Sequence, residues 1–268
     1  MLLAKLAEHQ IFPQCGVENQ ISRKIKRHTK NKGDKKTVNF FDAPCLLFLS
    51  RLTFQSHFLN HAIVAIVNDY IFKGVLLIAL LWWIWFKPGG SQQRNREIVT
   101  ITLISGLLAL VLGRLMAHYL PFRLRPMYTP EFQGMFHFAG VSEPVLRTWS
   151  AFPSDHAMLW CAIATGIFFA SWRAGIYSLL HALILICLPR VFLGLHFPSD
   201  VLAGALIGIV LTCAMNLPYL RTRGAAPILA IAQRYSGLFY GLAFILSFEL
   251  ATQFDELREL AQGMTHVI

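Results

Sequence analysis

The chain has 268 residues, of which 55% are hydrophobic and only 14% are charged. Soluble domains carry about 25% charged residues, so this composition excludes an ordinary water-soluble globular protein. The net charge is +10, but much of it lies in one N-terminal run, so a basic tail facing solvent or lipid headgroups is favoured over a nucleic-acid-binding surface.

The N-terminal part of the chain does not resemble a membrane span. Residues 1–43 are polar, basic and mostly aperiodic, which predicts a disordered tail. Residues 44–69 are moderately apolar but are interrupted by residues such as Arg51, Asn60 and Asp69. An interfacial or partly inserted helix fits this pattern better than a full crossing.

Residues 70–254 predict an all-α, polytopic membrane bundle of about six transmembrane helices, because their apolar runs match a hydrocarbon core about 30 Å thick. Residues 120–150 are too rich in Pro, Arg and Gly for a span and are expected at a membrane surface or lining a cavity. Residues 255–268 form an acidic tail. The expected spans are 70–86, 98–119, 155–172, 175–194, 199–217 and 236–254.

The loops predict which face of the cell membrane each segment occupies. Basic residues concentrate in alternate loops, which the positive-inside rule places in the cytoplasm. Residues 120–154 and 190–200 then lie outside. This scheme also places the basic N-terminus outside, so three explanations stay open: a seventh crossing at 44–68, a tail absent from the mature protein, or an inverted topology. The loop residues are Lys87, Arg94, Arg96, Arg173, Arg221 and Arg223.

Three short polar stretches flank these spans on the same predicted face. They are Arg123-Leu-Arg125-Pro126, then Phe152-Pro-Ser-Asp-His156, and then Arg190 followed by His196 and Asp200. Ionisable residues in membrane segments are costly and usually functional. We therefore expect the three stretches to form one pocket.

The residue types in this pocket suit phosphate. Arginine guanidinium groups match phosphate oxygens in geometry and charge. Ser154 and Ser199 each follow a proline and precede an apolar helix, which is the pattern of an N-cap. Free backbone N–H groups at such helix starts favour an anion.

Two histidines add the chemistry of a phosphatase. We expect His196 to attack phosphorus, with Asp200 holding its Nδ1–H, and His156 to protonate the leaving oxygen. No carboxylate cluster suggests a metal, so no cofactor is expected. Neutralisation of charge then falls to Arg125, Arg190 and Arg123.

Together the motifs Arg-Pro, Pro-Ser-x-His and Arg-x5-His-x3-Asp resemble the type 2 phosphatidic acid phosphatase superfamily, which includes the bacitracin-resistance type of undecaprenyl diphosphate phosphatase. The resemblance covers about residues 70–217. It implies a helical membrane enzyme in which the two histidines and the aspartate act as described, without a metal.

Three positions depart from the family pattern. His118 stands where the family has Lys, and Arg114 or Arg123 is an alternative source of that charge. Asp155 replaces Gly between Ser and His, a variant that looks like the undecaprenyl diphosphate branch. Pro189 replaces a Ser, so a hydroxyl contact to phosphate is lost or comes from Ser199.

The resemblance therefore implies hydrolysis of an undecaprenyl-type polyprenyl diphosphate to the monophosphate through a phosphohistidine. A phosphatidate or phosphatidylglycerol phosphate phosphatase is the alternative substrate class. The alternative from another functional class is a lipid-binding or transport membrane protein that keeps these polar residues but catalyses no reaction. The expected phosphate-binding residues are Arg125, Arg190, Ser154, Asp155, Arg123 and His118.

Overall fold

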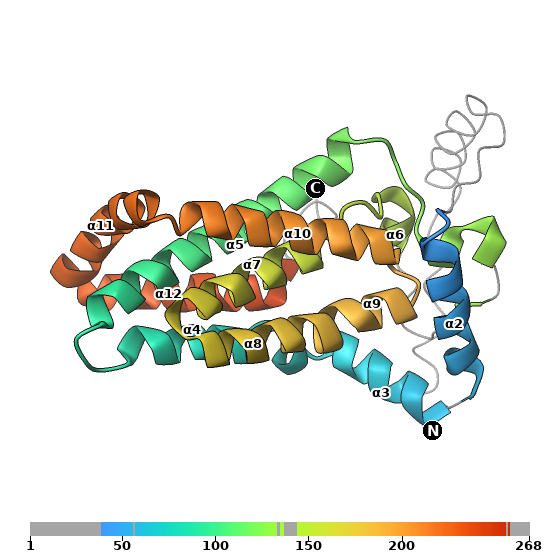
Figure 1. Ribbon diagram of the computed structural model, residues 1–268, viewed down its shortest axis with the longest axis horizontal. Helices are drawn as coiled ribbons and strands as arrows, with labels where there is room; N and C mark the ends of the chain where they lie inside the picture. The colour runs from blue at the N-terminus through green and yellow to red at the C-terminus, as the bar shows by residue number, and fades with distance from the viewer. Residues whose placement is uncertain (1–38, 56, 133–134, 137–143, 256, 258–268) are drawn as a thin grey trace, which may run out of the picture. The chain divides into compact units, whose positions relative to one another are not determined.

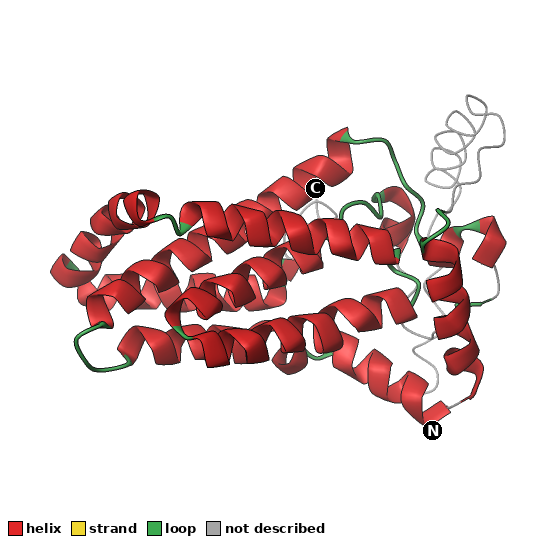
Figure 2. Cartoon of the chain, viewed as in Figure 1, coloured by secondary structure: helices red, strands yellow, loops and turns green. Residues whose placement is uncertain are grey.

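The computed structural model describes residues 39–55, 57–132, 135–136, 144–255 and 257. Every regular element among these residues is a helix, so the all-α prediction is confirmed for the described chain (Figure 2). Contacts divide the chain into the units Met1–Asn39 and Phe40–Ile268. The predicted disorder of the N-terminal tail falls almost entirely outside the described residues, as does most of the acidic C-terminal tail.

The segment expected as one interfacial helix contains two helices, α2 (Asp42–Gln55) and α3 (His57–Asn68). After α3 the chain bends by 68°, and the π-helix η1 (Ile71–Val75) leads into α4 (Leu76–Phe86). Asp69 lies at this bend, where its Oδ1 accepts a hydrogen bond from the backbone N–H of Ile71 (2.7 Å). The first predicted span is therefore the second half of a bent helix pair.

The remaining helices follow the predicted spans closely, with one exception. Residues between the fifth and sixth predicted spans, expected as a loop, form a helix instead. Pro218 pre-sets its first turn, and Ala225 and Leu229 give it a buried face one turn apart. The elements are α5 (Gln92–Tyr119), η2 (Pro126–Tyr128), η3 (Pro130–Phe132), α6 (Pro144–Thr148), α7 (Asp155–Ala170), α8 (Trp172–His181), η4 (Ala182–Cys187), α9 (Leu188–Phe192), α10 (Pro198–Met215), α11 (Pro218–Arg234) and α12 (Ser236–Thr252).

Three described helices are long and apolar enough to cross a membrane: Gln92–Tyr119, Trp172–Phe192 and Pro198–Met215. The second of these is α8, η4 and α9 in continuous succession. If the bent pair of α3 with η1 and α4 counts as one span, the described chain has up to four candidate spans. Helices α7 and α12 are also apolar but shorter. The number of six crossings stays a prediction.

Helix α7 forms the centre of the bundle. Its side chains from Ala157 to Ala164 are all buried, and it packs against α5, α8 and α10 (Figure 1). A helix that is apolar on every side has to be enclosed by other helices or by lipid. The N-terminus of α7 carries the second predicted motif, so the most buried helix also positions the candidate site.

Two glycines allow α10 to approach α7 closely. A Cβ at Gly204 would lie 2.5 Å from the carbonyl oxygen of Ser154, and one at Gly208 would lie 2.2 Å from that of Met158. This is the small-x-x-x-small pattern that lets membrane helices pack backbone against backbone. The starts of α7 and α10 are therefore held together by main-chain contact.

Substituting Gly208→Ala is expected to destabilise the protein by about 1–3 kcal/mol, because the added methyl group cannot fit without moving α7 or α10. The midpoint of thermal unfolding in one detergent measures this effect. Gly241→Ala is the matched control, since a Cβ there meets nothing within 4 Å and alanine is the better helix former. An unchanged midpoint for Gly208→Ala contradicts the packing argument.

Candidate active site

The three polar stretches meet at the end of the bundle where α5 ends and α7 and α10 begin. The backbone N–H of Ala151 donates to the carbonyl of Arg123 (2.8 Å), and that of Ser154 donates to the carbonyl of Asp200 (3.2 Å). The side chains of Arg123 and Asp200 form an ion pair. These contacts join the three stretches to one another, either directly or through the adjacent Ala151. The alternation of spans predicts this meeting at one end of the bundle.

His196 is the more enclosed of the two histidines, with 2% of its surface exposed. Its Nδ1 lies 2.8 Å from the carbonyl oxygen of Ala151, which makes Nδ1 the protonated nitrogen and leaves a lone pair on Nε2. Nε2 faces Nη1 of Arg125 at 3.4 Å. Burial, followed by the charge of Arg125, lowers the pKa of His196 well below its usual value. The ring is therefore neutral at neutral pH, the state that a nucleophile requires.

Asp200 does not hold His196, so the expected carboxylate–imidazole hydrogen bond is wrong. Its Oδ2 accepts from the backbone N–H of Phe197 (2.9 Å), which closes the first turn of α10. Its Oδ1 pairs with Arg123. A backbone carbonyl, that of Ala151, fixes the tautomer of His196 in place of the carboxylate.

The carboxylate partner belongs instead to the other histidine. His156 Nδ1 lies 2.9 Å from Oδ1 of Asp155, which also accepts from the backbone N–H of His156 (2.8 Å). Nε2 of His156 has no hydrogen-bond partner among the described residues. Asp155 was expected to bind phosphate, but a carboxylate repels an anion, so its position indicates that it orients His156.

Arg125 is buried beside His196. Its Nε donates to the carbonyl of Leu146 (3.2 Å) and its Nη1 to that of Leu195 (2.9 Å). Burial lowers the pKa of Arg125, while the carboxylate of Asp155 acts in the opposite sense. Nη2 makes no hydrogen bond to the described part of the chain, so a donor remains for an anion.

The other two arginines differ in their partners. The guanidinium of Arg190 makes no hydrogen bond to any residue that the structure describes, although the charge of Asp155 acts on it. The sequence also predicts that Arg123 binds phosphate, but both ends of its guanidinium are paired with carboxylates. Its Cζ lies 4.0 Å from the centre of the Phe197 ring. The guanidinium of Arg190 therefore keeps donors for an anion, whereas that of Arg123 is used in contacts within the protein.

The two serines are not equivalent. Ser154 is the N-cap of α7, as predicted, and its Oγ accepts from the backbone N–H of Ala157 (3.4 Å). Ser199 is not an N-cap, because Phe197 takes that place in α10. Its hydroxyl donates to Asp42 (2.7 Å) and accepts from Arg123 (2.9 Å).

Asp42, in the first turn of α2, is a residue that the sequence analysis missed. It is fully buried. Its Oδ2 accepts from Nη2 of Arg123 (2.6 Å), and its Oδ1 accepts from the backbone N–H of Ser199 (2.9 Å). An aspartate just before an apolar helix was the available signal. This carboxylate joins α2 to the start of α10.

Neither His118, at the position of the family lysine, nor Arg114 contacts His156 or His196 in the described chain. His118 is exposed, with its ring against Tyr119 at a centroid distance of 4.9 Å. Arg114 donates from Nη2 to the carbonyl of Gln253 (2.7 Å), where α12 ends. The positive charges that act on His196 come from Arg125 and Arg190, and the carboxylate of Asp155 opposes them.

Comparison with known proteins finds a family match for part of the chain. Residues 94–222 match the PAP2 superfamily. This range contains all three polar stretches but excludes Asp42. The bacitracin transport permease protein BcrC of Bacillus licheniformis is 26% identical over 167 residues, which cover 61% of this chain and 73% of that protein.

Two further relatives are more similar over shorter regions. An undecaprenyl-diphosphatase of Sulfolobus acidocaldarius is 32% identical, over 43% of this chain and 52% of that protein. The putative undecaprenyl-diphosphatase YbjG of Escherichia coli is 32% identical, over 51% of this chain and 62% of that protein. A solved transmembrane PAP2 type phosphatidylglycerolphosphate phosphatase from Bacillus subtilis superposes with a TM-score of 0.43 at 18% identity, covering 66% of this chain and 85% of that one.

Proposed function

We propose that this chain is a membrane phosphatase of the PAP2 superfamily, which its residues 94–222 match, and that it hydrolyses an undecaprenyl-type polyprenyl diphosphate to the monophosphate. The observation that carries the proposal is the state of His196, whose Nδ1 is held by a carbonyl while its Nε2 lone pair faces Arg125. The substrate class is supported by Asp155 and by two relatives named undecaprenyl-diphosphatases.

The terminal phosphate is expected to bind between Arg125 and Arg190, which retain free donors. Charge-assisted hydrogen bonds from guanidinium groups to phosphate are short and strong. They neutralise the oxygens and so lower the repulsion felt by an attacking lone pair. Arg123 is not expected to touch phosphate, because its donors are already used by carboxylates and by Ser199.

In the first step, Nε2 of His196 attacks the terminal phosphorus. The bond between this phosphorus and the bridging oxygen breaks, and the electron pair leaves with the polyprenyl monophosphate. His156 donates a proton to the leaving oxygen, while Asp155 stabilises the charged ring. The product on the enzyme is a phosphohistidine at His196.

In the second step, water attacks phosphorus and the bond to Nε2 breaks. His156, now neutral, takes a proton from this water, which is the reverse of its role in the first step. Inorganic phosphate leaves and His196 returns to its starting tautomer. By the positive-inside argument, we place this chemistry on the face of the cell membrane outside the cytoplasm.

Phosphate release from matched lipids tests the substrate proposal. The purified protein is expected to show at least about tenfold higher kcat/KM for a polyprenyl diphosphate than for phosphatidate or phosphatidylglycerol phosphate, since discrimination of this size needs only one additional favourable contact of about 1.4 kcal/mol. Equal or higher values for either phospholipid contradict it. The absence of release from all three lipids favours the non-catalytic alternative.

A further inference from the structure

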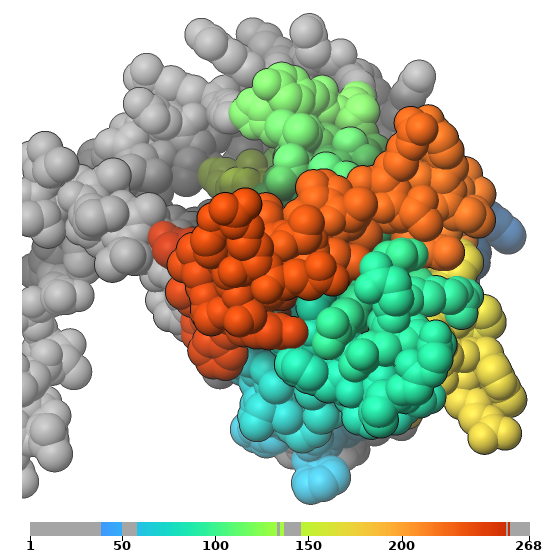
Figure 3. Space-filling model, turned by 90° about the vertical axis from the view of Figure 1, so that its left-hand side faces the viewer, coloured from blue at the N-terminus to red at the C-terminus, as the bar shows by residue number. Residues whose placement is uncertain are grey.

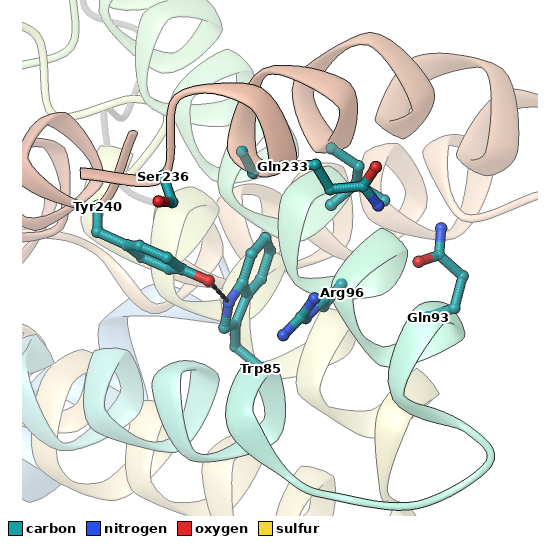
Figure 4. Close-up of a pocket in the computed structure, with 8 residues that line it drawn as sticks. Trp85, Gln93, Arg96, Gln233, Ser236 and Tyr240 are labelled. Carbon is teal, nitrogen blue, oxygen red and sulfur yellow. Dashed lines mark hydrogen bonds between the residues drawn. The ribbon is translucent and has the colours of Figure 1, made fainter. Parts of the chain in front are cut away.

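A cavity lies between α4, α5, α11 and α12, away from the histidines. It has a polar part, drawn in Figure 4, and an apolar groove. We propose that this cavity binds a membrane phospholipid with an anionic headgroup. The polar part is lined by residues that include Trp85, Gln93, Arg96, Gln233, Ser236 and Tyr240.

The position of the cavity separates it from catalysis. Arg96 lies in the second turn of α5 and the catalytic stretch follows the last turn, so a rise of 1.5 Å per residue puts about 35 Å between them. Figure 1 shows α11 at the end of the bundle opposite α2, and Figure 3 shows this end directly, where the surface of α11 meets that of α5. One phosphate group therefore cannot occupy both sites.

Arg96 provides the charge that selects an anion. Its Nε is buried and has no hydrogen-bond partner in the described chain, and its guanidinium lies 5.4 Å from the centre of the Trp85 ring. The described residues that line the polar part include no acidic side chain. An arginine that lines a cavity without a carboxylate beside it favours an anionic ligand, because guanidinium groups form strong hydrogen bonds to phosphate oxygens.

Neutral donors complete the polar part. Nε1 of Trp85 donates to Oη of Tyr240 (3.1 Å), which leaves the phenolic hydrogen available for a ligand. Figure 4 shows Trp85 lying between Tyr240 and Arg96, with Gln93 and Gln233 at the other side of the guanidinium. This arrangement supplies a fixed cation and several hydroxyl and amide donors, as a phosphodiester headgroup requires.

The apolar groove determines that the ligand is a lipid and not free phosphate. It shares Trp85 with the polar part and has a volume of about 240 Å³, less than the ~300 Å³ of a small drug-sized pocket. It therefore holds a segment of one acyl chain, with the rest in the bilayer. Leu238 and Leu242 line it and are exposed, so a chain can enter from the lipid side. Other lining residues are Leu81, Leu103, Leu107 and Ile231.

Binding of two lipids with identical acyl chains tests the proposal. The full-length protein carrying His196→Ala, which keeps catalysis out of the measurement, is titrated with phosphatidylglycerol and with phosphatidylcholine, and bound lipid is counted by native mass spectrometry. Phosphatidylglycerol has no terminal phosphate for the catalytic site. We expect it to bind about tenfold more tightly than phosphatidylcholine, the size of one charged hydrogen bond.

Single substitutions test whether the preference for phosphatidylglycerol arises in the cavity. Arg96→Gln is expected to abolish it, whereas Arg94→Gln is expected to keep it, because Arg94 points to the carbonyl of Phe169 and does not line the cavity. Gln233→Glu, at an exposed position on α11, should lower phosphatidylglycerol binding selectively even if Arg96→Gln folds poorly. Ala243→Phe in the groove should weaken both lipids.

Two results overturn the proposal. One is equal binding of the two lipids by the protein with Arg96 intact, which indicates annular lipid without headgroup selection. The other is an equal loss in Arg94→Gln and Gln233→Glu, which indicates a general surface charge effect. Neither result bears on phosphate release, so the proposed enzymatic function stands or falls separately.

Discussion

Replacing His196 with alanine is expected to lower phosphate release by about 10⁴-fold or more, the size seen when a nucleophile is removed from a catalytic unit. No other described imidazole has its Nδ1 fixed by a carbonyl while its Nε2 faces an arginine. The measurement is kcat/KM for a polyprenyl diphosphate in detergent. His61→Ala, an exposed histidine on α3, is the matched control and should retain activity.

Labelling of the protein separates the roles of the two histidines. With substrate labelled at the terminal phosphate, the His156→Ala variant should accumulate acid-labile label, because the second step lacks its base while the phosphorylated leaving group can depart unaided. The rate of release should fall by about 10²–10⁴-fold. The His196→Ala variant should carry no label. Label on His196→Ala, or full activity without His196, would falsify the assignment.

Replacing Asp42 with asparagine is expected to lower kcat by about 10–100-fold, with a smaller effect on KM, because a charged hydrogen bond contributes about 1.5–3 kcal/mol. The substitution removes one of the two carboxylates that hold Arg123 and weakens the link from α2 to Ser199. Asp42 does not contact the phosphate site directly, so it is a positioning residue. Steady-state kinetics on the polyprenyl diphosphate measure the effect.

The control for Asp42→Asn is the same substitution at Asp69, an aspartate whose side chain also accepts a hydrogen bond from a backbone N–H. Asp69→Asn preserves a side-chain oxygen at the bend between α3 and η1, where Asp69 accepts from the N–H of Ile71, and should leave kcat unchanged. The unfolding midpoint separates misplacement from instability. A loss of kcat in Asp42→Asn that disappears when assays are run well below the midpoint argues for a purely structural role.

The meeting of the three polar stretches was predictable from the sequence, because residues flanking spans on alternate sides share one face of a membrane. The detailed partners were not. Every residue has a carbonyl, so nothing in the sequence points to Ala151 as the acceptor for His196. Asp42 is separated from Arg123 by 81 positions, and local patterns carry no information about a pair so far apart.

The missed helix α11 has a different cause. The positive-inside rule counts Arg221 and Arg223 as loop charges, although Pro218 and the alanines that follow favour a helix. Arg221 lies 3.5 Å from Glu97 of α5, a pairing that a loop assignment does not anticipate. The bend of 68° before η1 was also missed, since hydropathy reports the length of an apolar run and not its direction.

The close approach of α10 to α7 has a consequence for how the enzyme responds to its bilayer. Thickness changes and lateral pressure tilt helices, and a catalytic centre divided between independently moving segments would lose alignment. Here Gly204 and Gly208 seat one backbone on the other, so His156 and the turn that carries His196 move as a unit. Turnover should therefore vary little between lipids of different chain length.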